Sequence, residues 1–216
     1  DETQRIYPSQ LEFIIDEIKK SNGNCIFSYD KQQCLRNWEL DNDISQVIKD
    51  KTSSIEYQLT EKIRTNKEIA SFIISLFNKS INIEKLNRHN IKLSYFQTYE
   101  DAKQYIKVLG EQGWKIINFT PSSRQNLPYD NYEILMEDNA HQVIGQEYDK
   151  VIAVIDQFFY YEGDNLSIRD YKSIPYYNPC KMLFQIMTRT RRELSIIVIN
   201  NDEIMSRCLS ILDSNS

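Results

Sequence analysis

The chain has 216 residues, with 26 lysines and arginines against 31 aspartates and glutamates, which gives a formal net charge of −5. Apolar residues make up 41% and charged residues 26%, a composition typical of a soluble globular domain and unlike that of a disordered chain. The apolar runs are far shorter than the ~20 residues that cross a bilayer. The acidic balance argues against a general polyanion binder of the histone type, but a local positive groove can exist on an acidic protein, so charge neither implies nor excludes nucleic acid. The length predicts one domain or one and a half.

Cysteine and histidine usage limits the kinds of metal site and the compartment. The four cysteines are scattered and form no C-x-x-C pair, so neither a disulfide framework nor a zinc site is indicated. His89 and His141 both lie far from any cysteine, so a metal would be a hard, oxygen-bound ion such as Mg²⁺. Reduced thiols without an export signal predict a cytoplasmic protein. The chain begins with Asp1 rather than methionine, so we expect it to be part of a longer protein.

Helical and strand-like patterns alternate along the chain, which predicts an α/β sheet with crossover helices. Apolar residues at three- and four-residue steps predict helices over 8–20, 43–50, 66–79, 99–112, 179–187 and 201–212. Short apolar runs predict strands over 25–28, 91–96, 115–119, 133–137, 150–156 and 194–199. The last five strands are expected to form one mainly parallel sheet with helices on both faces. The segments 120–131 and 157–178 are expected to be long loops.

The expected loop at 157–178 is rich in aromatic residues. They are Phe158, Phe159, Tyr160, Tyr161, Tyr171, Tyr176 and Tyr177. Stacking on nucleic-acid bases is one interpretation, because single-strand grooves combine aromatic side chains with positive charge. Acidic residues outnumber basic ones in this loop, however, so packing against the sheet edge is the interpretation that we favour.

Two polar clusters lie near the start of the chain. The first, Asp1 to Gln4, opens with an adjacent acidic pair, and a preceding strand would place this pair at the carboxyl edge of a sheet. Nucleotide hydrolases use such a pair to hold magnesium and to orient the attacking water. The alternative is an acidic cap on the helix from residue 8. In the second cluster, Asp30 and Gln33 follow the strand at 25–28, and taken alone they indicate only a polar turn.

Three further clusters contain arginine or glycine. Arg64 stands just before a helix that Thr65 or Asn66 would cap, where it either reaches a phosphate or is simply solvated. The polar turn at 141–149 contains Gly145, which allows close backbone approach to a ligand. The segment 185–192 places three arginines at the mouth of the strand at 194–198. That position suits phosphate binding, although a charge run is more often a solvated face.

The order of the five clusters resembles the carboxyl-terminal motifs of superfamily 1 helicases of the UvrD type. The closest resemblance is to bacterial ATP-binding proteins with a Schlafen-related DNA/RNA helicase domain. The sequence DETQ is similar to the Walker B motif D-E-x-Q. Asp30 and Gln33 are similar to motif III, G-D-x-x-Q, with Tyr29 where glycine is usual.

The later motifs lie in the same order as in that family. Leu59–Thr65 is similar to the arginine motif IV, L-x-x-x-x-R-[ST]. His141–Tyr148 is similar to motif V, H-x-x-x-G-x-E-[FY], with Ile144 in place of the customary lysine. Thr188 and Arg189, followed by an apolar strand, are similar to motif VI. The resemblance therefore covers nearly the whole chain.

The resemblance implies a chemical role for each matching residue. Asp1 would hold Mg²⁺, and Glu2 would act as the general base for the attacking water. Gln4 and Gln33 would sense the γ-phosphate and couple it to nucleic acid.

Two arginines and the motif V turn would complete the implied nucleotide site. Arg64 and Arg189 would be arginine fingers from the second RecA-like domain, converging on one point to stabilise charge in the transition state. Gly145 and Glu147 would line the nucleotide from the same side, with Glu147 near the ribose.

The resemblance further implies a P-loop NTPase (RecA-like) fold, with the end of the first RecA-like domain at 1–55 and the second domain at 56–216. The sequence contains no G-x-x-x-x-G-K-[ST] motif. In this family that motif would precede Asp1, so these 216 residues alone are expected to bind ATP weakly or not at all.

The implied function is the motor half of a nucleic-acid-dependent ATPase or helicase. Its cofactors would be ATP and Mg²⁺, and its partners single-stranded DNA or RNA and the missing amino-terminal ATPase segment. Two alternatives stay open. The chain could be a regulatory P-loop ATPase module that switches an attached effector domain without unwinding, or a non-catalytic binding domain.

Overall fold

The computed structural model describes residues 2–30, 34, 39, 41–53, 55–57, 66–81, 89–123, 125–172 and 174–213. The helices are η1 (Thr3–Arg5), α1 (Pro8–Lys20), α3 (Ile44–Lys51), α4 (Lys67–Phe77), α5 (Tyr99–Glu111), η3 (Pro128–Tyr132), α6 (Pro179–Met187) and α7 (Asp202–Asp213). The strands are β1 (Ile91–Phe96), β2 (Lys115–Ile116), β3 (Tyr148–Ile155), β4 (Phe159–Glu162), β5 (Asn165–Ile168) and β6 (Thr190–Ile199).

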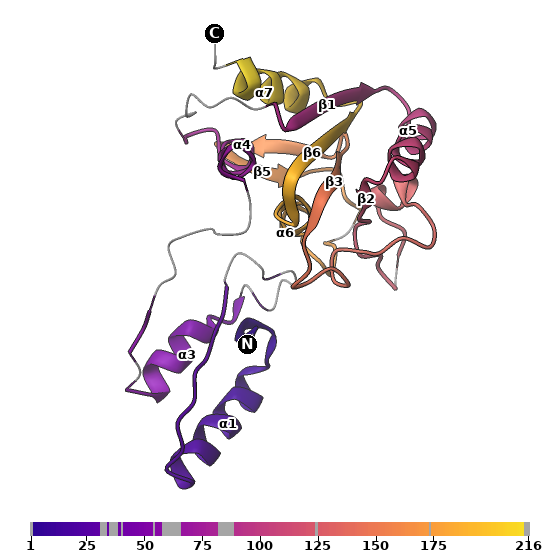
Figure 1. Ribbon diagram of the computed structural model, residues 1–216. Coiled ribbons are helices and arrows are strands. Elements are labelled where there is room, and N and C mark those ends of the chain that lie inside the picture. Colours follow the sequence, from indigo (N-terminus) through magenta and orange to yellow (C-terminus); the bar gives the residue numbers. More distant parts are fainter. Residues whose placement is uncertain are drawn as a thin grey trace.

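Four of the strands form one sheet in the order β1-β6-β3-β2, and every neighbouring pair is parallel (Figure 1). One row of the sheet runs through Ile91, Leu194, Val151 and Lys115, which are partners from strand to strand. Helix α5 contacts β1, β2 and β6, and α6 contacts β3 and β6. The expected α/β fold with a parallel sheet flanked by helices is therefore confirmed.

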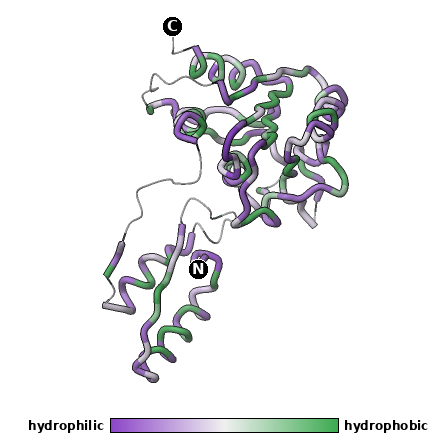
Figure 2. Tube along the Cα trace, in the orientation of Figure 1, coloured by the Kyte–Doolittle hydropathy of each residue, from purple (hydrophilic) through white to green (hydrophobic). Residues whose placement is uncertain are grey.

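The two central strands form the core of this sheet. Residues Val151–Ile155 of β3 and 194–199 of β6 are buried without interruption, which is typical of parallel strands covered on both faces. Figure 2 shows hydrophobic stretches along the centre of this α/β part. At the end of the sheet where these strands begin, Asp149 of β3 and Arg191 and Arg192 of β6 are exposed, whereas Thr190 is buried.

The helix ends follow from their sequence. The Thr98 hydroxyl accepts a hydrogen bond from Asp101 N at 3.2 Å and so caps α5. Beyond its other end lies Gly113, at φ 83, a backbone conformation that favours glycine. Asn178 caps α6 in the same way as Thr98 caps α5, and Pro179 occupies the first helical position. These signals explain why the predicted helices start and stop close to the observed ones.

The predicted strand at Ile134–Glu137 is wrong. Asn118, which is buried, donates from its amide nitrogen to Ile134 O at 2.8 Å and accepts from Ile134 N at 3.0 Å. Both backbone groups of Ile134 are therefore taken by a side chain rather than by a neighbouring strand. Leu135 and Met136 are exposed, and Met136 has φ 70, so the segment is a turn.

The segment 157–178 is not the plain loop that the sequence suggested. It contains the antiparallel hairpin β4–β5, in which Phe159 pairs with Ile168 and Glu162 with Asn165. Phe159 and Tyr161 are buried, and the Tyr161 hydroxyl donates to Leu76 O at 2.6 Å. Phe159 and Tyr161 thus pack into the core, and the hairpin contacts α4, α6 and α7. The expected packing of this segment against the sheet edge stays a prediction.

The amino-terminal residues form a small helical unit with its own apolar cluster. Leu11 and Ile15 of α1 pack with Ile44 and Ile48 of α3. This cluster shares no member with the large cluster around the sheet, whose residues run from Ile69 to Ile211. The proposed domain boundary at 55/56 lies between the two clusters and stays a prediction.

The predicted buried strand at Cys25–Ser28 is also wrong. Its backbone is assigned to no strand, and Thr3 N donates to Ser28 O at 2.9 Å. Cys25 is exposed and Ile26 is 92% exposed, whereas Phe27 packs partly against the helices. Among the described residues, no helix has the length and apolar character that crossing a membrane requires.

Candidate functional site

Two sequence motifs more than 40 positions apart meet where β3 and β6 begin. The backbone N–H of Tyr148 donates to Arg189 O at 2.9 Å, and Tyr148 is the register partner of Thr190. The Arg189 guanidinium returns the contact, with Nη1 donating to Gln146 O at 3.3 Å. The turn similar to motif V and the arginine similar to motif VI are therefore joined by both backbone and side chain.

Arg189 is held in place by the tight link between α6 and β6. Thr188 ends the helix, and its hydroxyl donates back to Phe184 O at 2.9 Å. The Arg189 N–H then donates to Ile186 O at 3.2 Å, one residue before β6 begins. Arg189 is only 5% exposed. The guanidinium is thus anchored against the turn, in contrast to a loosely ordered side chain.

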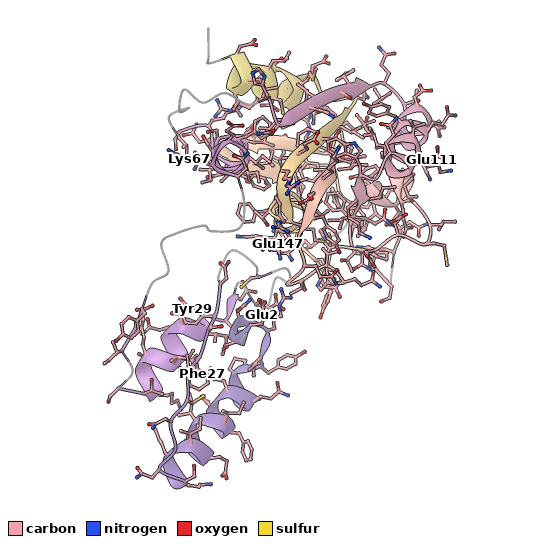
Figure 3. The ribbon with its side chains drawn as sticks, in the orientation of Figure 1. Glu2, Phe27, Tyr29, Lys67, Glu111 and Glu147 are labelled. Carbon is pink, nitrogen blue, oxygen red and sulfur yellow. The ribbon has the colours of Figure 1, made fainter. Side chains whose placement is uncertain are left out.

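The segment from His141 to Glu147, here called the 141–147 turn, presents an open backbone. Gly145 is exposed and has φ 78, and no atom lies within 4 Å of the position that a Cβ would occupy. Glu147 is half-buried, and Figure 3 shows it where β3 begins. Gly145 and Glu147 therefore flank Gln146, whose carbonyl accepts from Arg189, so the structure brings Arg189, Gly145 and Glu147 together. Their shared role at a nucleotide stays a prediction.

His141 has a structural role within this turn. Its Nδ1 lies 2.7 Å from the Thr120 hydroxyl, and its ring packs at 4.2 Å from the Tyr177 ring. Tyr177 in turn packs against Tyr176 at 4.8 Å between ring centroids. Tyr177 of the 157–178 segment therefore packs directly against the 141–147 turn, and Tyr176 packs against Tyr177.

Charged side chains surround the start of the sheet. The Lys115 Nζ donates to Asp138 at 2.7 Å and lies 5.4 Å from the centre of the Tyr148 ring. Burial raises the pKa of the Tyr148 phenol, and the positive charges of Lys115 and Arg189 oppose that rise. Hydrogen bonds from Lys150 and Lys92 lower the pKa of Glu193. Arg189 therefore lies near lysines that are paired with acidic residues, and not in a uniform basic patch.

The two amino-terminal clusters also contact each other. Gln4, which is buried, accepts from Asp30 N at 3.2 Å and donates to Glu2 Oε2 at 2.8 Å. The same Glu2 oxygen accepts from Arg5 Nε at 2.9 Å. The segment similar to Walker B and the segment similar to motif III are thus linked through Gln4. Figure 3 labels Glu2 and Tyr29 of these two segments.

Three predicted site residues, Asp1, Gln33 and Arg64, lie outside the described residues. The predicted magnesium ligand and the convergence of Arg64 with Arg189 therefore stay predictions. Within the described part of the chain, no group of three or more histidine, cysteine or acidic residues could hold a metal ion.

Sequence reasoning missed the groups that fasten the 141–147 turn. Gln146 contributes through its backbone carbonyl, which no side-chain pattern reveals. Asn139 accepts at its side-chain oxygen from His141 N at 3.1 Å and from Gln142 N at 3.3 Å. An asparagine two residues before a polar run is a known turn signal, and it would have identified Asn139.

Comparison of the chain with protein-family models, with curated proteins and with solved structures finds no match in any of the three. A functional conclusion therefore depends on the residues and geometry of this chain.

Proposed function

We propose that this chain is the carboxyl-terminal motor half of a nucleic-acid-dependent ATPase similar to superfamily 1 helicases. The observation that supports this most is the contact between Arg189 and the carbonyl of Gln146, reinforced by the bond from Tyr148 N to Arg189 O. It joins two motifs that are far apart in sequence and that the resemblance assigns to one nucleotide site. In this proposal the second RecA-like domain is built on the sheet β1-β6-β3-β2, with ATP held by a segment outside these 216 residues.

The residues at the start of β3 and β6 fit a phosphate ligand. The open backbone at Gly145 leaves room for a ligand against the turn, and the neighbouring guanidinium favours negative charge. A guanidinium carries five N–H donors in a fixed fork, so holding the turn and binding a phosphate are compatible. ATP with Mg²⁺ would supply the phosphoanhydride bond that is hydrolysed.

The described site residues each have a chemical role in this proposal. Arg189 stabilises negative charge that develops on the transferred phosphoryl group, which requires a donor already in place. Glu147 would lie beside the bound nucleotide, and Gly145 would let the backbone approach it. Glu2 accepts a proton from the attacking water, and Gln4 connects Glu2 to the segment at Asp30.

ATP hydrolysis by the intact protein tests this proposal through Arg189→Ala. Arginine fingers contribute on the order of 10³ or more in rate. We therefore expect turnover to fall by about that factor, while ATP affinity changes only several-fold, because the contact tightens in the transition state. Arg191→Ala is the matched control, since Arg191 is exposed and lies two residues further along. It should leave turnover within about twofold.

Arg189→Lys separates a catalytic loss from a structural one. Lysine keeps the charge but lacks the planar fork, so turnover should stay far below that of the unchanged protein even if folding is normal by circular dichroism. Turnover within threefold of the unchanged protein for Arg189→Ala would contradict the proposal. If adding single-stranded DNA or RNA does not change ATP turnover, the alternative of a regulatory P-loop ATPase module would be favoured.

A further inference from the structure

Asp156 is a buried acidic residue at the opposite end of the sheet from Arg189. It follows the last residue of β3 and is 0% exposed. Its Oδ1 accepts from Phe158 N at 3.1 Å, and its backbone carbonyl accepts from Phe159 N at 3.2 Å and from the Asn201 side chain at 2.8 Å. Among the described residues, Oδ2 receives no hydrogen bond.

Three phenols from separate segments lie close enough to this carboxyl group to interact with it electrostatically. Tyr99 begins α5, Tyr132 ends η3, and Tyr171 follows β5. The Tyr99 and Tyr132 rings stack at 5.9 Å, and Tyr171 packs edge-on against Phe158 at 5.9 Å. Burial raises the pKa of all three phenols, and the nearby carboxyl of Asp156 adds to each shift. We call Asp156 with Tyr99, Tyr132 and Tyr171 the Asp156 cluster.

The cluster offers little to stabilise a negative charge. Burial raises the pKa of Asp156 to about 7, against the opposing effect of the hydrogen bond from Phe158 N–H, of its own backbone and of the nearby Tyr99 hydroxyl. No lysine or arginine of the described residues is among the groups that set this value. The other ionisable groups near the cluster are Tyr129 in η3 and Cys180 at the start of α6, which both lie close to Tyr171. Both are uncharged near neutral pH, because burial raises their pKa as well.

Both ends of the β4–β5 hairpin meet at this cluster. Phe158 enters the hairpin and is bonded to the Asp156 carboxyl, while Tyr171 leaves it. Arg169 N donates to Phe158 O at 2.9 Å and ties the two ends together. A change of charge at Asp156 therefore acts on the entry and the exit of the hairpin at once.

We propose that the Asp156 cluster is a proton-controlled latch, which fastens the β4–β5 hairpin to the sheet while Asp156 carries a proton and loosens it when the proton is lost. The phenol and amide groups can bond a neutral carboxyl, but in the part of the chain that the structure describes no cation balances a charged one. The latch does not depend on the ATPase proposal, since none of its residues belongs to the 141–147 turn.

The sign of the pH effect follows from the two states of the carboxyl. In the closed hairpin the pKa is about 7, whereas in an opened one it returns toward the ordinary value of 3.8. Between these values the closed form binds more protons than the open form, so closure weakens as pH rises. Below and above that window closure is independent of pH at this group.

Hydrogen exchange of the hairpin amides, measured between pH 5.5 and 8.5 and corrected for the intrinsic rate, tests the latch. Protection of residues 159–168 should fall by up to about tenfold per pH unit between pH 5.5 and 7 and then level off. Asp156→Asn keeps an oxygen for Phe158 N and cannot ionise, so its protection should be flat with pH and higher than that of the unchanged protein at pH 8. Asp213→Asn, at an exposed position, should behave as the unchanged protein does.

Equal hairpin protection in the unchanged protein and in Asp156→Asn at every pH would overturn the proposal. If Asp156→Asn fails to fold, the carboxyl carbon of Asp156 can be followed by NMR in the unchanged protein. A titration midpoint near 7 would support the latch, and one below 5 would overturn it. The ATPase assay is a separate measurement, so the two proposals fail independently.

Discussion

The two ends of the parallel sheet differ in how they treat polar side chains. Where the strands begin, Gly145 is exposed, Glu147 is half-buried, and charges such as Lys115 are paired at the surface. Where they end, Asp156 and Asn201 are buried, and the hairpin connected to β3 covers them. Ligands of open α/β sheets usually bind beyond the carboxyl ends of the strands. In this chain Asp156 and Asn201 are buried at that end, whereas the exposed Gly145 lies at the amino end.

Under the proposed function, this contrast means that ligand binding belongs to one end of the sheet and structural hydrogen bonding to the other. At the amino end, the Arg189 guanidinium donates to the Gln146 carbonyl, and the backbone at Gly145 beside it is open. The carboxyl end uses its polar groups to join the strands to α7 and to the hairpin. Mutations should therefore act on activity at one end and on stability at the other.

Asn201 is where we expect the largest effect on stability. Its amide donates to Asp156 O and Phe159 O, both at 2.8 Å, and its oxygen accepts from Ile204 N at 3.1 Å. Asn201→Ala would leave buried backbone groups without partners, at a cost of about 3 kcal/mol in unfolding free energy. Urea unfolding measures this. Asn131→Ala, at an exposed position, should cost less than about 0.5 kcal/mol, and equal losses for both variants would erase the contrast.

Cysteine alkylation tests whether the carboxyl end is closed to solvent. Burial raises the pKa of Cys180, beside Tyr171 at the start of α6, to about 12. Because the thiolate is the reactive form, iodoacetamide at pH 8 should label Cys180 at least about 100-fold more slowly than the exposed Cys25. Mass spectrometry of the labelled peptides measures both rates in one sample. Similar rates at the two cysteines would show that this end of the sheet is open.

Substitutions of Gly145 should have the smallest effect on unfolding free energy, because they change only the preferred backbone conformation. A Cβ at this position would meet no atom, but φ 78 is unfavourable for alanine. Gly145→Ala should therefore lower the unfolding free energy by about 1 kcal/mol. Asparagine tolerates this conformation better, so Gly145→Asn should cost less than Gly145→Ala. The reverse order in thermal unfolding would indicate that the turn changes shape.

The sequence predicted best those helices whose bounds are set by nearby residues. The helices at 8–20, 99–112 and 179–187 lie within about two residues of α1, α5 and α6, because apolar spacing and capping residues specify them. The strand at Ile134–Glu137 failed because an apolar run alone does not reveal that Asn118 binds its backbone. The hairpin β4–β5 was not predicted, because its aromatic residues were interpreted as part of a long loop over 157–178.

The site at Arg189 and the Asp156 cluster also differ in whether a local sequence pattern could predict them. Arg189 and Gly145 could be named in advance, since each lies in a short motif with fixed spacing. The Asp156 cluster could not, because Tyr99, Tyr132 and Tyr171 come from three separate segments and no local pattern connects them. The sequence offers only one hint, an aspartate directly after the apolar run Val151–Ile155.

The turn at Leu135 and Met136 affects how the protein responds to oxidation. Met136 stands at its tip fully exposed, whereas Met182 and Met187 of α6 are buried. Peroxide would convert the thioether of Met136 into a sulfoxide without having to open the fold, since susceptibility follows exposure. The buried sulfurs would be oxidised only after the helix separates from the sheet. The sulfoxide content of this one turn therefore records the exposure of a sample to oxidant, and oxidation of α6 records its unfolding.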